Sequence, residues 1–169
     1  LDPPAAAWTL EDLEQAGRQL TRDANGDGRP DRFGYVLQHQ LPGAYPLLRL
    51  FDAHLFSSNG EASAVTEENT LSLLRWLHEQ THAHQIAPRP AQVELGSLDM
   101  FRSERAAMLR GDLRTLVILH RMREDAPRTG STLLPVHPST GKEAAAAQGM
   151  TYGITRATVS SELASQAVR

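Results

Sequence analysis

The sequence predicts an α/β fold in which a small mixed sheet is covered by helices. Segments with helical periodicity alternate with short apolar segments, which is the pattern of an α/β architecture. The 169 residues are enough for one domain with its own core. With 40% hydrophobic and 22% charged residues, the composition is that of a soluble globular domain. We therefore expect residues 1–169 to form a single α/β lobe.

Three elements joined by polar loops are predicted first. Thr9 is placed to cap a helix, with Asp12 at the third helical position, close to a capping box. Residues 33–38 have the composition of a strand, and residues 45–54 that of a buried helix. The apolar stripe of the first helix recurs at helical spacing and consists of Leu10, Leu13, Ala16 and Leu20.

A long amphipathic helix is predicted next. Thr66 is placed to cap residues 67–84, and the helix ends before Pro88 because proline cannot continue it. Its apolar face is too wide to remain in water, so we expect Trp76 to be buried with Leu73, Leu74 and Leu77. The remaining elements are a short helix capped by Ser97 (98–104), a strand (106–111), a helix (112–124), two strands (131–136 and 150–155) and a final helix from Thr158 or Ser160.

Charge and composition exclude several classes of function. The net charge is −3 and no block of basic residues is present, which argues against a nucleic-acid partner. The absence of cysteine excludes disulfides, thiolate catalysis and cysteine-based zinc sites. No apolar run is long enough to span a bilayer, so we expect no direct membrane insertion.

The segment 23–34, DANGDGRPDRFG, has the spacing of a calcium-binding loop. Gly28 falls on the glycine that such a loop requires, but Gly34 stands where a bidentate glutamate completes it. The same residues suit a turn held by Asx side chains, with glycines at positive φ. Both interpretations remain open, and no other cofactor is expected. The calcium ligands would be Asp23, Asn25, Asp27, the carbonyl of Arg29, and Asp31.

This loop and its surroundings resemble bacterial extracellular solute-binding proteins, the sugar receptors that feed ABC importers. In that family a Trp-Thr pair leads into a helix ending in Leu-Thr, followed by a DxNGDGxxDxxG loop and a strand, as in residues 8–35 here. Three later segments are similar in the same order: LLRLFDAHLFSSNGE (47–61), LLRWLHEQTHAHQIAP (73–88) and MFRSERAAMLRGD (100–112). The likeness covers nearly the whole chain.

The resemblance implies one lobe of a periplasmic-binding-protein-like (type II) fold, excised from a longer two-lobe protein. The implied function is to bind a carbohydrate or related polar solute between two lobes that close about a hinge. The implied partners are this solute and the membrane subunits of an ABC importer, and the implied location is extracytoplasmic. No enzymatic activity is expected.

Five residues are expected to line the half of the cleft that this lobe supplies. They lie at strand ends or in the segments that follow, where open α/β sheets place ligands. Two depart from the family pattern: His54 stands where a glycine pair is usual, and Leu113 with Arg114 where many members have a tryptophan. The predicted ligand-binding residues are Gln38, Tyr45, His54, Asp112 and Arg114.

Two alternatives remain open at this point. The same lobe could serve as the ligand-sensing domain of a regulatory protein, which would make it cytoplasmic. A metal-dependent hydrolase could use His78, His82 and His84, since the first two have a spacing that can bind zinc on a helix. Histidine near a helix C-terminus is also favoured by the helix dipole alone.

Overall fold

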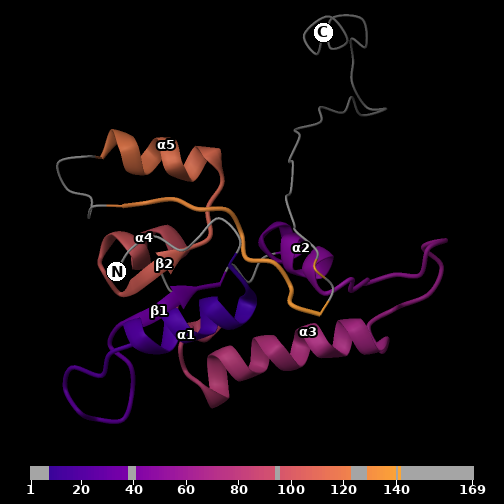
Figure 1. Ribbon diagram of the computed structural model, residues 1–169, viewed down its shortest axis with the longest axis horizontal. Coiled ribbons are helices and arrows are strands. Elements are labelled where there is room, and N and C mark those ends of the chain that lie inside the picture. Colours follow the sequence, from indigo (N-terminus) through magenta and orange to yellow (C-terminus); the bar gives the residue numbers. More distant parts are fainter. Residues whose placement is uncertain (1–7, 38–40, 94–95, 123–128, 140, 142–169) are drawn as a thin grey trace, which may run out of the picture.

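A computed structural model describes residues 8–37, 41–93, 96–122, 129–139 and 141. Two strands lie at its centre and helices surround them (Figure 1). No helix in this part of the chain is long and apolar enough to cross a membrane. The elements are α1 (Leu10–Leu20), β1 (Phe33–Val36), α2 (Leu41–Leu50), α3 (Glu68–His78), the π-helical turn η1 (Glu79–Ala83), the 3-10 turn η2 (Pro90–Gln92), α4 (Ser97–Arg102), β2 (Ala106–Leu109) and α5 (Leu113–Arg121).

The sheet is formed by β1 and β2, which run parallel. Phe33 pairs with Ala106, and Tyr35 pairs with Met108. A parallel pair needs a crossover connection, and here α2, α3 and α4 lie between the two strands in the sequence. Both predicted strands begin at the expected residue and end two residues early. The α/β class is therefore confirmed.

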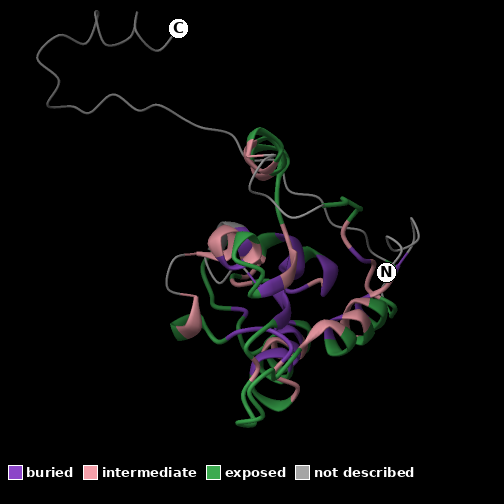
Figure 2. Ribbon diagram, turned by 90° about the vertical axis from the view of Figure 1, so that its left-hand side faces the viewer, coloured by how far each residue is buried: buried purple, intermediate pink, exposed green. Residues whose placement is uncertain are grey.

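Apolar side chains form two clusters that contain residues of β1. Figure 1 shows α1 and α4 on opposite sides of the strands, and buried residues gather around the strands in Figure 2. The smaller cluster consists of Phe33, Val36, Met100 and Ala106. The larger cluster consists of Leu10, Tyr35, Leu37, Leu47, Leu48, Leu50, Phe51, Ala53, Leu73, Trp76, Ile86 and Ala87.

Helix α1 begins as its sequence predicts. Thr9 is the N-cap, and its hydroxyl accepts a hydrogen bond from the backbone N–H of Asp12 at 3.2 Å. The Asp12 carboxylate accepts the backbone N–H of Thr9 at 2.8 Å, which completes the capping box. Further along, α1 crosses β1 at two glycines: a Cβ added at Gly34 would lie 2.3 Å from the carbonyl oxygen of Gly17.

Three predicted helices have wrong boundaries. Helix α2 covers Leu41–Leu50 rather than 45–54, and it ends before Asp52, whose φ is 53°. Helix α3 is capped by Glu67 rather than Thr66, and α4 by Gly96 rather than Ser97; neither cap makes a side-chain hydrogen bond. Serine and threonine favour the cap position, but here the cap is the neighbouring residue, one position away in each case.

The strand predicted at 131–136 is replaced by a single bridge. Val136 pairs in parallel with Thr9, through hydrogen bonds from Val136 N–H to the Trp8 carbonyl and from Leu10 N–H to the Val136 carbonyl. Pro135 has no N–H to donate to a ladder, which limits the pairing. The predicted strand at 150–155 and the final helix lie outside the described residues.

The prediction for the apolar face of α3 is confirmed except at one residue. Trp76 and Leu73 are buried, and Leu77 packs against the larger cluster. Leu74 is 46% exposed, so its predicted burial is wrong. At 3.6 residues per turn, positions 73, 76 and 77 share one face, while position 74 is turned away from it.

Candidate functional site

The carboxyl-terminal ends of β1 and β2 meet at one edge of the sheet because the strands are parallel. Leu37 directly follows β1 at this edge, and Arg110 to Asp112 directly follow β2. Ligand sites in open α/β sheets lie outside this edge, so it is the candidate solute site. The structure thus places two predicted site residues, Asp112 and Arg114, together at the end of β2 and the start of α5.

Asp112 is the N-cap of α5. One oxygen of its carboxylate accepts the backbone N–H and the hydroxyl of Thr115, each at 2.8 Å. These two hydrogen bonds lower the pKa of Asp112 below its usual range. Asp112 therefore remains ionised at neutral pH and offers acceptor sites at the edge.

Arg110 is a residue of this edge that the sequence prediction missed. It is half-buried, and burial lowers the pKa of its guanidinium while the nearby Asp112 carboxylate acts in the opposite direction. A guanidinium stays charged under such shifts and presents several donors in a fixed plane. The sequence signal that could have identified Arg110 is the motif Leu-Arg-Gly-Asp at the end of a predicted strand.

Helix α5 adds an apolar surface beside these charges. In Figure 2 it stands above the buried centre of the molecule, and none of its residues is buried. Leu113 is 77% exposed, and Leu116 and Val117 are exposed on the same side at helical spacing. The candidate site therefore combines donors, a carboxylate and an aliphatic surface.

The other predicted site residues belong to segments that follow β1 or lie outside the described part. Tyr45 is on α2, which follows β1, and is 54% exposed. His54 lies beyond the far end of α2, a helix of about 15 Å, where the Thr70 hydroxyl accepts its N–H and donates to its carbonyl. Gln38 falls outside the described residues. The ligand role of all five residues stays a prediction.

The loop between α1 and β1 is held by its own side chains. Asp23 accepts the backbone N–H groups of Gly26 and Gly28 with its two carboxylate oxygens, at 2.7 and 2.9 Å. Asn25 accepts from Asp27 N–H at 2.9 Å, and Asp27 from Arg29 N–H at 2.8 Å. Asp31 closes the loop by accepting from Ala24 N–H at 2.8 Å. These bonds make the predicted Asx turn.

The calcium interpretation of this loop stays a prediction. Within the described residues, no three His, Cys, Asp or Glu side chains are grouped so that they could hold a metal ion. The backbone donors of the loop nevertheless have side-chain acceptors, so its conformation has a local explanation.

We expect Asp23→Ala to lower the free energy of unfolding by about 2 kcal/mol in the presence of a chelator, because two backbone N–H groups lose their acceptor. Urea unfolding measures this loss, and Asp27→Ala, which removes one backbone bond, should cost less. Calorimetric titration of the chelated wild type tests the metal. Heat and a higher melting temperature with millimolar calcium would establish binding, and neither change would leave the Asx turn alone.

The histidines at the end of α3 lie face to face. The rings of His78 and His82 stack with centroids 4.5 Å apart and planes at 3°. His82 Nδ1 lies 2.8 Å from the Thr81 hydroxyl, a hydrogen bond within its own turn. The hydrolase alternative requires a third ligand, and no such group is present in the part of the chain that the structure describes.

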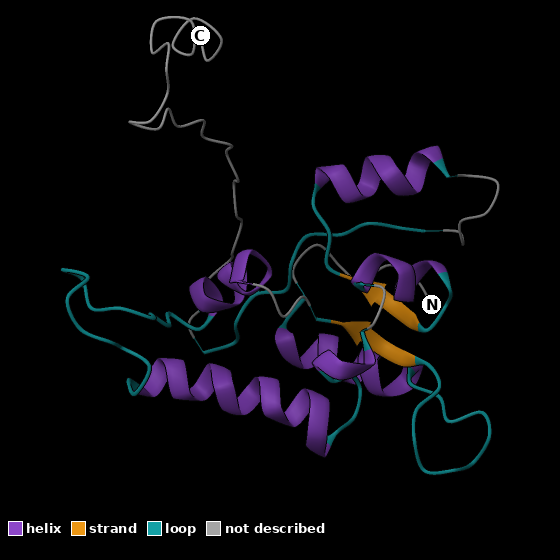
Figure 3. Cartoon of the chain, turned by 180° about the vertical axis from the view of Figure 1, so that it is seen from behind, coloured by secondary structure: helices purple, strands orange, loops and turns teal. Residues whose placement is uncertain are grey.

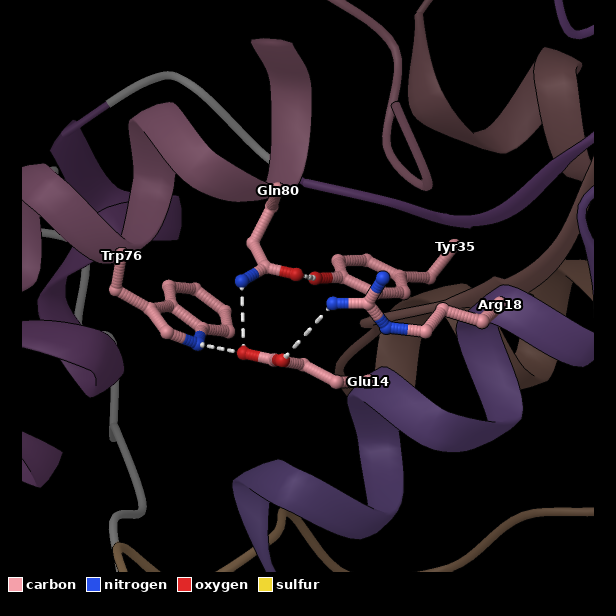
Figure 4. Close-up of polar contacts among 5 residues, drawn as sticks. All are labelled: Glu14, Arg18, Tyr35, Trp76 and Gln80. Carbon is pink, nitrogen blue, oxygen red and sulfur yellow. Dashed lines mark hydrogen bonds and ion pairs between the residues drawn. The ribbon is translucent and has the colours of Figure 1, made fainter. Parts of the chain in front are cut away.

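A polar network joins α1, β1 and the helix α3–η1 inside the lobe (Figure 4). One oxygen of Glu14 accepts hydrogen bonds from Trp76 Nε1 and Gln80 Nε2, both at 2.8 Å. The Gln80 carbonyl oxygen accepts from the Tyr35 hydroxyl at 2.7 Å. Burial, reinforced by the charge of Glu14, raises the pKa of Tyr35 far above its usual range, so its hydroxyl remains a donor.

The fold resembles one lobe of a substrate-binding protein, as the sequence resemblance predicts. The maltose/maltodextrin-binding domain MalE from Bdellovibrio bacteriovorus, bound to maltotriose, superposes with a TM-score of 0.64 over 85% of this chain at 20% identity. The ABC substrate-binding protein Lmo0181 from Listeria monocytogenes, in complex with cycloalternan, superposes with a TM-score of 0.59 over 75% of this chain at 23% identity.

The chain spans about a third of the length of these two proteins, covering 36% of the first and 31% of the second. No family model and no curated protein matches the sequence. The comparison therefore defines the fold, and it does so over most of the chain.

Proposed function

We propose that this chain is the solute-binding lobe of an extracytoplasmic receptor for an ABC importer, and that its solute is a carbohydrate or a related polar molecule. One observation carries the proposal. The parallel strands bring Arg110, Asp112 and Arg114 to the carboxyl-terminal edge of the sheet in a fold shared with two sugar-binding proteins. Binding without catalysis is part of the proposal.

The chemistry of this edge suits a solute with hydroxyl groups. Arginine donates and aspartate accepts hydrogen bonds, and the exposed Leu113 offers an apolar surface to C–H groups. Tyr45, on the helix that follows β1, adds an exposed phenol ring. The proposed partners of this lobe are the second lobe of the receptor and the membrane subunits of the importer.

One lobe supplies about half of the contacts in a two-lobe cleft. Halving the binding energy of a micromolar complex leaves roughly millimolar affinity. We therefore expect the 169-residue chain to bind sugars weakly and the complete receptor to bind them with micromolar affinity or better. NMR titration with mono- and oligosaccharides, following residues 110–114, tests this expectation. Micromolar binding by the chain alone contradicts the single-lobe proposal.

A further inference from the structure

A hollow of about 390 Å³ lies where three segments meet: the end of α1, the loop between α1 and β1 (residues 23–31, here called the Asp/Gly loop) and the chain leaving η1. Figure 3 shows this loop extending away from the sheet. The loop leads into the amino-terminal end of β1, whereas the candidate solute site lies at the carboxyl-terminal ends of both strands. The hollow is therefore separate from the candidate solute site at the carboxyl-terminal edge of the sheet. Its volume is within the range of small-molecule sites.

The wall of the hollow is fixed by hydrogen bonds. The Thr21 hydroxyl donates to the Gly17 carbonyl at 2.8 Å and accepts from Gly34 N–H at 3.1 Å. On the facing segment, the N–H of Ile86 donates to the Gln80 carbonyl at 3.0 Å. A wall fixed in this way loses little freedom when a ligand binds.

The backbone beside the hollow has two uncommon features. Residue Gln85, which lines it, has a φ of 52°, in a region that non-glycine residues rarely adopt. The turn η1 that precedes it is π-helical. Strained residues and π-helical turns both occur preferentially at functional sites.

The charges of the lining select the class of ligand. Arg18 and Asp23 contribute one charge of each sign. Arg18 is half-exposed, and its 3.9 Å contact with Glu14 is longer than a hydrogen bond. The Asp23 carboxylate has accepted two backbone N–H groups and has further lone pairs. Asp23 would repel a bound anion and Arg18 would repel a bound cation, whereas neutral hydroxyl groups can form hydrogen bonds with both side chains.

The rest of the lining supports the same class. His84 supplies a ring that can donate or accept, and Pro30 and Ala83 supply apolar contact. A ring with hydroxyl groups around it and C–H groups on its faces matches this mixture of polar and apolar groups. We propose that the hollow between α1, the Asp/Gly loop and η1 binds a neutral, hydroxyl-rich ring such as a monosaccharide, independently of the interlobe cleft.

NMR titration of the ¹⁵N-labelled chain with D-glucose tests this site. We expect shifts at the amides of Gly28, His84 and Gln85, which line the hollow. Arg18→Met removes the donors and keeps the aliphatic stem, and should weaken glucose binding about tenfold. Arg29→Met is the matched control, because this arginine is exposed on the Asp/Gly loop, next to Gly28, and does not line the hollow.

Four outcomes overturn the proposal. The first is no shift at about 0.1 M glucose. The second is shifts confined to residues 110–114, which would support the cleft and leave the hollow without a ligand. The third is equal glucose binding by wild type and Arg18→Met. In the fourth, inorganic phosphate at matched ionic strength shifts the hollow while glucose does not, which would show an anion site. Shifts at the hollow alone would confirm that the hollow binds glucose. They would leave the proposed receptor function, which concerns the edge at residues 110–114, without support.

Discussion

Gly34→Ala is expected to destabilise the lobe by more than about 3 kcal/mol. The added Cβ would lie 2.3 Å from the Gly17 carbonyl oxygen and 2.4 Å from the Gly17 Cα. Both are backbone atoms, so no side-chain rotation relieves the contact, and α1 would have to move away from β1. Urea unfolding followed by tryptophan fluorescence measures the loss.

The matched control is Gly130→Ala. A Cβ at this position would meet no atom within 4 Å, and its backbone is not in the left-handed region. We expect its stability to stay within about 0.5 kcal/mol of the wild type. A Gly34→Ala variant as stable as this control would show that the close approach of α1 and β1 does not exist in solution.

Gln80→Met is expected to cost about 3 kcal/mol. The Gln80 side chain is fully buried and links Glu14 to the Tyr35 hydroxyl. Methionine has a similar size and no amide, so Tyr35 loses its buried acceptor while packing is largely kept. The cost comes from polar groups left without a partner.

A double-mutant cycle with Tyr35→Phe separates the hydrogen bond from packing. Tyr35→Phe alone should destabilise the lobe, because it leaves the Gln80 carbonyl oxygen buried without its donor. In the Gln80→Met background the same change should be nearly neutral. Additive effects of the two substitutions would contradict the network in Figure 4.

Hydrogen bonds between residues close in the sequence could be predicted from the sequence, and contacts between distant segments could not. The Thr9–Asp12 capping box follows from residues three positions apart, so spacing alone predicts it. The Asx turn is likewise contained in its own loop. Gln80, in contrast, lies on a predicted helix among polar residues, and only the fold brings it to Glu14 and Tyr35.

The candidate site shows the same division. Asp112 was placed correctly at the end of a strand, because a strand followed by Gly-Asp and a helical pattern is a local signal. The half-buried state of Arg110 depends on what packs around the strand end, which no spacing rule contains. His54 follows the end of α2, and its backbone bonds with the Thr70 side chain of α3, a contact between separate segments that no spacing rule contains.

The parallel pairing of β1 with β2 also bears on how the chain acquires its structure. During synthesis, residues 33–36 emerge long before their partners at 106–109. Until then β1 has an unpaired edge, and its four residues are all buried in the final lobe. Closing so long a loop costs entropy before any sheet bond forms, which slows folding relative to a helical bundle. Nascent chains that end before residue 106 therefore expose a strand that can pair with other chains.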